Sequence, residues 1–222
     1  MVAPGRRHDR ALLDALEAIE AERFSDEVWR VVRQGRDALR GSAAGGRWSP
    51  PGEFEVLYTS LSRAGALAEI GYRLSLEPIW PSRIRHDLHR IGARTARSLH
   101  FARVAELVPL GVDAAKYGSF DYSVTQAIAA AARFLEFDGL IVPSARYDCA
   151  NIVLFLDRAS DGNRLELLGT EDVDWEAWRK RVARPRRAEF GPMLNRNRAG
   201  STRRPRARLS HPCQPNGRSG RI

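Results

Sequence analysis

The sequence predicts an α+β fold, with a mixed β-sheet core and flanking helices. Segments with helical spacing of apolar residues lie at the front, in the middle and near the end of the chain, with about six short strand-like segments among them. These strands do not alternate regularly with the helices, so a doubly wound parallel sheet is not expected. We therefore expect a mixed α+β sandwich.

The first half of the chain is predicted to open with a helix over residues 9–24, where leucines and an isoleucine recur at helical spacing with acids opposite. Residues 41–53, GSAAGGRWSPPGE, are rich in Gly, Ser and Pro and predict a loop. The other elements expected in this half are, in order, a strand at 27–33, a strand at 54–60, a helix at 61–74 and a segment at 84–93 that fits no single pattern.

The second half is centred on YSVTQAIAAAARFLE, residues 122–136, whose alanine-rich composition predicts a helix that is buried on one side. From Pro185 onward the chain has few large apolar residues and many Arg, Pro, Gly and Asn, so disorder is expected there. The remaining predicted elements are strands at 97–104, 139–144, 151–156 and 164–169 and a last helix at 174–181.

The positive charge of the chain is concentrated at its C-terminus. The formal net charge is +9, and residues 181–222 alone hold twelve arginines and one acid, Glu189. Residues 1–180 therefore carry 24 basic and 26 acidic residues, a balance of −2. The high pI thus says little about what the folded part binds. Direct nucleic-acid binding is expected only through the tail, if at all.

Neither a membrane span nor a secretory signal is expected. The longest uncharged run, residues 122–132, is eleven residues long, which is too short for a membrane helix. Acidic residues interrupt every apolar segment near the N-terminus. Cys149 and Cys213 provide neither a disulfide framework nor zinc spacing, and His86 and His89 lack an evident third ligand, so no metal site is expected. We expect a protein of the reducing cytoplasm.

Three chemically distinct residues lie eleven positions apart in three consecutive predicted elements. Arg47 is in the loop, Tyr58 in the following strand and Glu69 in the following helix. A guanidinium pairs well with two phosphate oxygens, and small residues beside Glu69 leave room for a ligand to approach it. Together the three would suit an anionic, sugar-containing ligand, although unrelated surface residues would show the same spacing by chance.

The local amino-acid sequence around these residues resembles that of the RES-domain family. The stretches GGRWSPPG, VLYTS and ALAEI are followed by TQAIAAAARFLEFDGLIVPSAR and then NIVLF, and the likeness runs from about Val28 to about Leu168. One position departs from the pattern, because Ser49 stands where an asparagine is expected. The characteristic residues of the family fall on Arg47, Tyr58, Glu69, Ser144 and Asn151.

The resemblance implies a fold like that of ADP-ribosyltransferase toxins and an enzyme that destroys NAD⁺ by phosphorolysis or hydrolysis. NAD⁺ is then the substrate, inorganic phosphate the co-substrate of phosphorolysis, and no cofactor is expected. It also implies a bacterial toxin neutralised by an antitoxin with a helix-turn-helix domain, in a hetero-oligomeric complex. The expected organisation is an N-terminal helix within 1–26, a RES-like catalytic domain over 27–181 and a basic tail over 182–222.

The residue types suit this chemistry. Nicotinamide leaves NAD⁺ as a neutral molecule, so no general acid has to protonate it, whereas ordinary glycosidases need two carboxylates. One carboxylate, assigned to Glu69, is sufficient to stabilise the oxocarbenium-like ribose. Arg47 is expected at the pyrophosphate, and Tyr58 at the nicotinamide or its ribose. These three residues are the predicted catalytic set.

Ser144 and Asn151 are predicted as substrate-binding residues with alternatives. Ser144 would orient the nicotinamide ribose or position Glu69, and Asn151 is expected to brace the loop 144–150 more than to touch the ligand. If phosphate is the nucleophile, a second cation is needed, and Arg146 or Arg30 is the candidate.

Two other functions remain open at this point. An ADP-ribosyltransferase that passes the sugar to a macromolecule would use the same pocket with a different acceptor. A nucleic-acid-binding protein would instead act through residues 181–222, and NAD⁺ would be left untouched.

Overall fold

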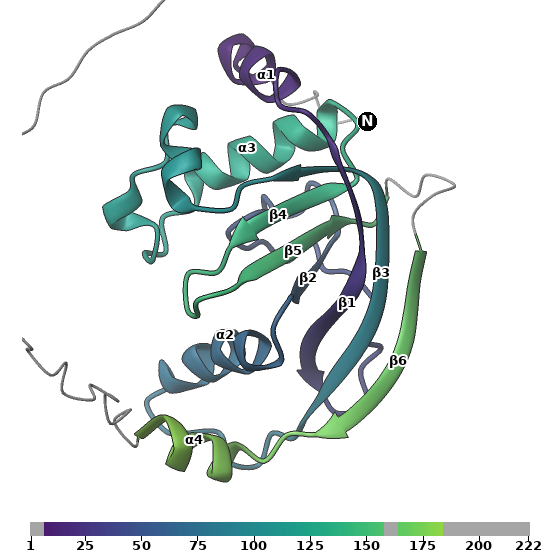
Figure 1. Cartoon of the computed structure of the whole chain (residues 1–222). Coiled ribbons are helices and arrows are strands. Elements are labelled where there is room, and N and C mark those ends of the chain that lie inside the picture. The colour runs from purple at the N-terminus through teal and green to yellow at the C-terminus, as the bar shows by residue number, and fades with distance from the viewer. Residues whose placement is uncertain (1–6, 158–163, 184–222) are drawn as a thin grey trace, which may run out of the picture. The chain divides into compact units, whose positions relative to one another are not determined.

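A single curved sheet of six strands organises the part of the chain that the structure describes (Figure 1). The computed structural model describes residues 7–157 and 164–183. The strand order is β1-β2-β5-β4-β3-β6, and β1 also pairs with β3, so that five strands close into a ring and β6 extends it from β3. The strands are β1 Glu22–Arg33, β2 Val56–Ser60, β3 His86–His100, β4 Gly139–Pro143, β5 Ala150–Phe155 and β6 Arg164–Asp172.

Within the described ranges, four α-helices surround this sheet, and two of them flank strands that carry the candidate site. In Figure 1 the β4–β5 pair lies between α3 and α2. The α-helices are α1 Arg10–Glu17, α2 Arg63–Ser75, α3 Ser123–Phe134 and α4 Trp175–Ala183, and two 3₁₀ helices cover Val104–Leu110 and Ala114–Lys116.

The interior of the ring is a hydrophobic cluster to which every ring strand contributes. Its members include Val28, Leu57, Ile91, Ile141 and Ile152. Full burial of one such side chain stabilises the fold by about 1.5–3 kcal/mol. Alternate residues of a strand point to opposite faces, so their neighbours on β2, β5 and β4 face outward. That outer face packs against the buried alanines of α3 in a second cluster.

A third cluster fixes α2. Ala66 and Leu67 of α2 are buried with Val31 of β1, Leu88 of β3 and Trp175 of α4. Gly71 allows α2 to approach α4 closely, since a Cβ at this position would fall 2.2 Å from the Trp178 ring. The position of α2 against the sheet decides where its polar face lies.

The helix predicted over 9–24 is shorter than expected. Asp9 caps α1 by accepting from the Ala11 backbone N–H at 2.8 Å, and the helix ends at Glu17. Residues from Glu22 onward instead belong to β1 and pair with β3. Pairing with a distant strand outweighs the local helical pattern here, which is why periodicity extended the helix too far.

The ambiguous segment 84–93 and the strand predicted at 97–104 are parts of one strand, β3, which ends at His100. Its outward face is covered by α2 and α4 near Leu88 but exposed at Arg90 and Arg94. No single alternation of polar and apolar residues therefore runs along it. The tail predicted from Pro185 onward lies outside the described residues.

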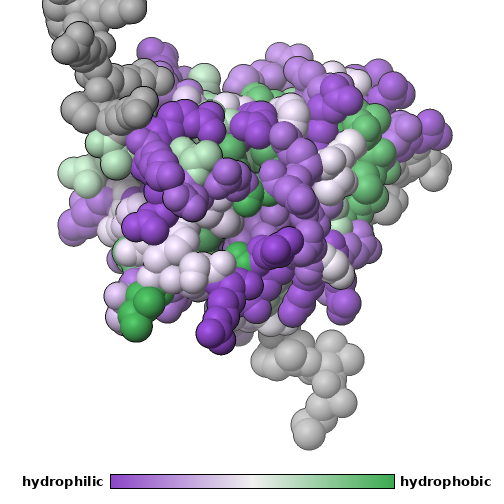
Figure 2. Space-filling view, turned by 90° about the horizontal axis from the view of Figure 1, so that it is seen from below, coloured by the Kyte–Doolittle hydropathy of each residue, from purple (hydrophilic) through white to green (hydrophobic). Residues whose placement is uncertain are grey.

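The face of the molecule drawn in Figure 2 is mostly polar. Figure 2 shows a largely hydrophilic face on which hydrophobic residues form separate patches. Every helix in the described ranges is too short or too polar to cross a membrane.

Candidate active site

Strands β2 and β5 deliver two of the predicted residues to the same face of the sheet. They are antiparallel, with Tyr58 opposite Val153 and Ser60 opposite Asn151. Because Leu57 and Ile152 fill the ring interior, Tyr58 and Asn151 project to the outer face. The loop between β4 and β5 carries the third, Ser144, whose backbone N–H donates to the Cys149 carbonyl at 2.9 Å.

The carboxylate of Glu69 is held from one side by two donors. Ser144 Oγ donates to Glu69 Oε1 at 2.6 Å, and Asn151 Nδ2 donates to the same oxygen at 3.0 Å. Among the described residues no donor bonds Oε2. One oxygen of the carboxylate is thus fixed by the protein, and the other is left for a ligand.

The direction of the Ser144 hydroxyl is determined by its own backbone surroundings. The N–H groups of Arg146 and Tyr147 lie 3.1 and 3.3 Å from Ser144 Oγ and donate to it. With its lone pairs accepting from these groups, the hydroxyl has its proton free for Glu69. Of the two roles predicted for Ser144, the structure shows the positioning of Glu69.

Asn151 also bonds Glu69, and among the described residues its side chain makes no hydrogen bond to the loop 144–150 that it was predicted to brace. Its Oδ1 is buried without a hydrogen-bond partner among the described residues. An orphaned buried acceptor destabilises the fold by about 1–3 kcal/mol. The side chain of Asn151 nevertheless adopts the orientation in which Nδ2 donates to Glu69. This orientation leaves Oδ1 without a partner among the described residues.

Tyr58 holds the loop that carries Arg47. The Trp48 backbone N–H donates to the Tyr58 hydroxyl at 2.9 Å, and Ser49 Oγ lies 3.2 Å from it. Burial raises the pKa of Tyr58, with the Ser49 contact opposing the rise. Gly46 is required by this approach, because a Cβ there would fall 2.7 Å from the same hydroxyl. The phenol is thus a neutral anchor of the loop.

The N-terminal turn of α3 holds the same loop from the other side. Thr125 Oγ1 donates to the Arg47 carbonyl at 2.6 Å, and Gln126 Nε2 donates to the Gly46 carbonyl at 2.8 Å. Sequence reasoning did not single out these two residues. The available signal was a polar Thr-Gln pair opening an otherwise apolar, alanine-rich helix.

The side chain of Arg47 is half-buried among neutral groups. Its guanidinium carbon lies 4.8 Å from the ring centroids of both Tyr117 and Tyr122. Nη2 donates to the Ser119 carbonyl at 3.1 Å. Among the described residues no carboxylate pairs with it. A cation held by aromatic faces and a carbonyl keeps its charge available for an anionic ligand.

Tyr117 connects the two halves of the site. Its hydroxyl donates to the Pro143 carbonyl at 2.7 Å, next to Ser144, while its ring contacts Arg47. Burial raises the pKa of Tyr117, the Arg47 charge opposes the rise, and the Glu69 charge adds to it. All five predicted residues therefore belong to one connected set, and Tyr117 and Tyr122, like Thr125 and Gln126, are members that sequence reasoning missed.

Four other residues that could suggest a site have structural explanations. Trp48, next to Arg47, is buried in the core cluster beneath α3. The Cys149 thiol lies 3.3 Å from Ser60 Oγ, and burial raises its pKa, which opposes a role as a nucleophile. His86 Nδ1 accepts from Trp175 Nε1 at 3.1 Å, and His89 Nδ1 lies 2.9 Å from the Thr170 hydroxyl.

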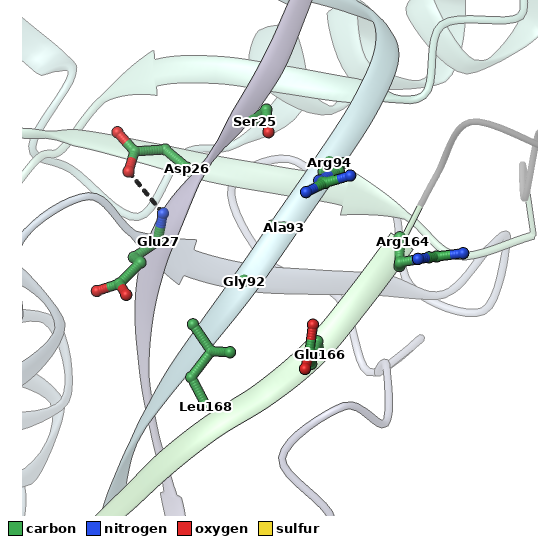
Figure 3. Close-up of a pocket in the computed structure, with 9 residues that line it drawn as sticks. All are labelled: Ser25, Asp26, Glu27, Gly92, Ala93, Arg94, Arg164, Glu166 and Leu168. Atoms are coloured by element: carbon green, nitrogen blue, oxygen red, sulfur yellow. Dashed lines mark hydrogen bonds between the residues drawn. The ribbon is translucent and has the colours of Figure 1, made fainter.

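A separate pocket of about 290 Å³ lies on β1, β3 and β6 (Figure 3). Its walls carry both acids, such as Asp26 and Glu166, and the bases Arg94 and Arg164. None of the five predicted residues lines it. The mixed charge does not favour a ligand of either sign, so the candidate site remains the one around Glu69.

The fold and the site together define a class: an α+β protein with one oriented carboxylate and a half-buried arginine that has no carboxylate partner among the described residues. Residues 27–176 match the model of the RES domain, and the chain belongs to this family.

Several known proteins are similar to this chain. NAD(+) phosphorylase MbcT of Mycobacterium tuberculosis is 27% identical over 143 residues, which are 62% of this chain and 77% of the relative. Probable NAD(+) phosphorylase Rv3189 of the same species is 34% identical over 121 residues, 54% of this chain and 56% of the relative.

A solved structure supports the fold. The crystal structure of the M. tuberculosis MbcT-MbcA toxin-antitoxin complex contains a chain that matches with a TM-score of 0.69 and 24% identity. The match covers 79% of this chain and 99% of that one. It confirms the expected α+β fold with a mixed sheet.

Proposed function

We propose that this protein degrades NAD⁺ by phosphorolysis of the bond between nicotinamide and ribose, and that it is the toxin of a toxin–antitoxin pair. Membership of the RES domain family and the names of its relatives, both NAD(+) phosphorylases, support the reaction. The name of the solved complex supports an antitoxin partner. We propose a helix-turn-helix domain in that partner and a cytoplasmic location for the pair.

The observation that carries the proposed reaction is the one-sided anchoring of Glu69. Oε1 is bonded by Ser144 and Asn151, and we therefore assign Oε2 to the reacting ribose. There it stabilises the positive charge that develops as the glycosidic bond breaks. A carboxylate preorganised by two donors does not need to reorient in the transition state.

The atoms of the reaction balance without a cofactor. The bond between ribose C1 and the nicotinamide nitrogen breaks, and its electron pair neutralises the pyridinium, so nicotinamide leaves uncharged. A phosphate oxygen forms the new bond to C1, and the proton it carried is released to solvent. The products are nicotinamide and ADP-ribose-1″-phosphate. With water as the nucleophile the product would be ADP-ribose.

Arg47 is the residue we assign to the pyrophosphate of NAD⁺. Its guanidinium has only neutral partners among the described residues, and the donated bond to Ser119 leaves other N–H groups free. Arginine binds phosphate oxygens in a bidentate manner, which fixes orientation as well as affinity. Tyr58 acts through this residue by holding its loop.

The test is NAD⁺ consumption by the purified chain, with products identified by mass, for the wild type and Glu69→Gln. Glu77→Gln, an exposed glutamate just beyond α2, is the matched control. We expect rapid loss of NAD⁺ with the wild type and the control, and a loss of activity of about 100-fold or more with Glu69→Gln.

The same assay separates the alternatives. Radiolabel from the adenylate part of NAD⁺ that appears on protein or nucleic acid would indicate an ADP-ribosyltransferase. If the wild-type protein left the NAD⁺ concentration unchanged, both with and without phosphate in the buffer, the proposed reaction would be wrong.

A further inference from the structure

We propose that Arg146 forms the subsite for inorganic phosphate, and that it thereby selects phosphate over water as the acceptor of the ADP-ribosyl group. This inference rests on the proposed function. It assigns a ligand class to a residue of the β4–β5 loop and explains how a single pocket would hold two separate anions.

Arg146 lies beside the catalytic carboxylate. Its backbone N–H donates to Ser144 Oγ, which in turn donates to Glu69. Its guanidinium carbon lies 3.6 Å from the centroid of the Tyr72 ring. Tyr72 follows Glu69 by three positions in α2, so the two side chains are neighbours on one face of the helix. The charge of Arg146 is thus placed one helical turn from the carboxylate.

Among the described residues, the charge of Arg146 is uncompensated. Its partners are the Tyr72 ring, the Phe120 ring at 5.7 Å and the Gly118 carbonyl, to which Nη2 donates at 2.8 Å. Among the described residues no carboxylate pairs with it. Some other arginines of the fold are compensated, as Arg63 is by Glu171. A half-buried guanidinium with neutral partners and unused N–H groups is an anion site.

Arg47 and Arg146 hold consecutive carbonyls of one short segment. Arg47 donates to Ser119 and Arg146 to Gly118. The two cations therefore approach the segment 117–122 from the Arg47 loop and from the β4–β5 loop respectively. The proposed reaction has two anions, the pyrophosphate of NAD⁺ and free phosphate. One uncompensated arginine for each matches this requirement.

Arg30, the other candidate for the second cation, does not fit. It lies in β1 opposite His89 of β3 and donates to the Ala38 carbonyl at 3.0 Å. Burial lowers its pKa to about 10, although the nearby Asp37 charge acts in the opposite direction. Its side chain therefore lies on the β1–β3 side of the ring, where it bonds the Ala38 carbonyl. Asn151 projects from the outer face of the sheet instead.

Arg73 is the competing cation on α2. It follows Glu69 by four positions, but its side chain is exposed. Its charge acts to lower the pKa of Tyr58, against the larger effect of burial. An exposed arginine is screened by solvent and binds phosphate less strongly than a half-buried one. Both arginines are therefore included in the test.

The experiment compares the full-length wild type with Arg146→Gln, Arg146→Lys, Arg73→Gln and the remote control Arg103→Gln. Each protein is assayed with NAD⁺ over a range of inorganic phosphate concentrations. The KM for phosphate, the KM for NAD⁺ and the ratio of ADP-ribose-1″-phosphate to ADP-ribose are measured, together with the melting temperature.

For Arg146→Gln we expect the KM for phosphate to rise by about tenfold or more, because a charge-assisted contact is lost. The KM for NAD⁺ should change by less than about twofold, and the product should shift toward ADP-ribose. Arg146→Lys should restore part of the phosphate dependence, since it keeps the charge but not the planar fork. The two other variants should behave as the wild type.

Three results would overturn the inference. One is an unchanged product ratio in Arg146→Gln with a raised KM for NAD⁺ or a lowered melting temperature, which indicates a purely structural role. The second is a phosphate defect in Arg73→Gln instead. The third is a wild type that consumes NAD⁺ at a rate independent of phosphate, which removes the subsite but leaves NAD⁺ cleavage intact. The failure of the proposed function, no NAD⁺ loss at all, is a distinct result.

Discussion

Ser144 Oγ lies 2.6 Å from Glu69 Oε1, and this bond joins the loop after β4 to the middle of α2. The hydroxyl accepts from two backbone N–H groups, so its proton has one direction available. The carboxylate is consequently oriented by a side chain that is itself oriented by its own loop. The orientation of Glu69 thus depends on the fold of the β4–β5 connection.

Replacing Ser144 by Ala should slow the reaction more than it weakens binding. The loss of one charge-assisted bond, worth about 1.5–3 kcal/mol, predicts a fall in kcat of about 10- to 100-fold. The KM for NAD⁺ should change little. Steady-state kinetics check this, with the exposed Ser82→Ala as control. An equal loss in both parameters, accompanied by unfolding, would assign Ser144 to stability alone.

Tyr58→Phe should weaken NAD⁺ binding through the loop of Arg47. Removing the hydroxyl leaves the Trp48 N–H without its acceptor, and the protein should lose about 1–3 kcal/mol of unfolding free energy. The KM for NAD⁺ should rise more than kcat falls, because Arg47 is displaced while Glu69 is not. Urea unfolding and kinetics measure the two effects, with the exposed Tyr147→Phe as control. A selective fall in kcat would point to direct contact of the phenol with the ribose.

Gly46→Ala should destabilise the protein by about 1–3 kcal/mol, as expected for overpacking. The added Cβ would meet the Tyr58 hydroxyl at 2.7 Å, whereas in the control Gly92→Ala the nearest atom is 3.5 Å away. The double variant Gly46→Ala, Tyr58→Phe removes the clashing oxygen. Its loss of unfolding free energy should therefore be smaller than the sum of the two single losses. Additive losses would show that the clash is relieved elsewhere.

The unfolding free energy should fall as the pH drops below about 6.5, the ordinary pKa of histidine. Burial lowers the pKa values of both His86 and His89. As the pH falls through this range, the two histidines are protonated in the unfolded chain while they stay neutral in the folded one. In addition, protonation of His86 at Nδ1 would remove the acceptor of the Trp175 N–H.

Urea unfolding from about pH 7.5 to about pH 5.5 measures this dependence, and each histidine contributes at most about 1.4 kcal/mol per pH unit. His86→Gln and His89→Gln should each flatten the slope. A slope that neither variant alters would assign the pH dependence to other groups.

The types of most elements were predictable because they depend on local patterns. The alanine-rich helix, the loop around Arg47 and the short strands around Ser144 and Asn151 follow from composition and spacing within a few residues. Two features were not predictable: where α1 ends, and that residues 86–100 form one continuous strand, β3. Both are decided by pairing with strands far along the chain.

The sequence by itself determined which residue types make up the candidate site: one arginine, one tyrosine, one glutamate, one serine and one asparagine, each in its local element. Only the tertiary structure decided what these residues do to one another. Ser144 and Asn151 reach Glu69 across separations of 75 and 82 residues. Such contacts depend on the register of β4 and β5 and on the packing of α2, which no local pattern of residues encodes.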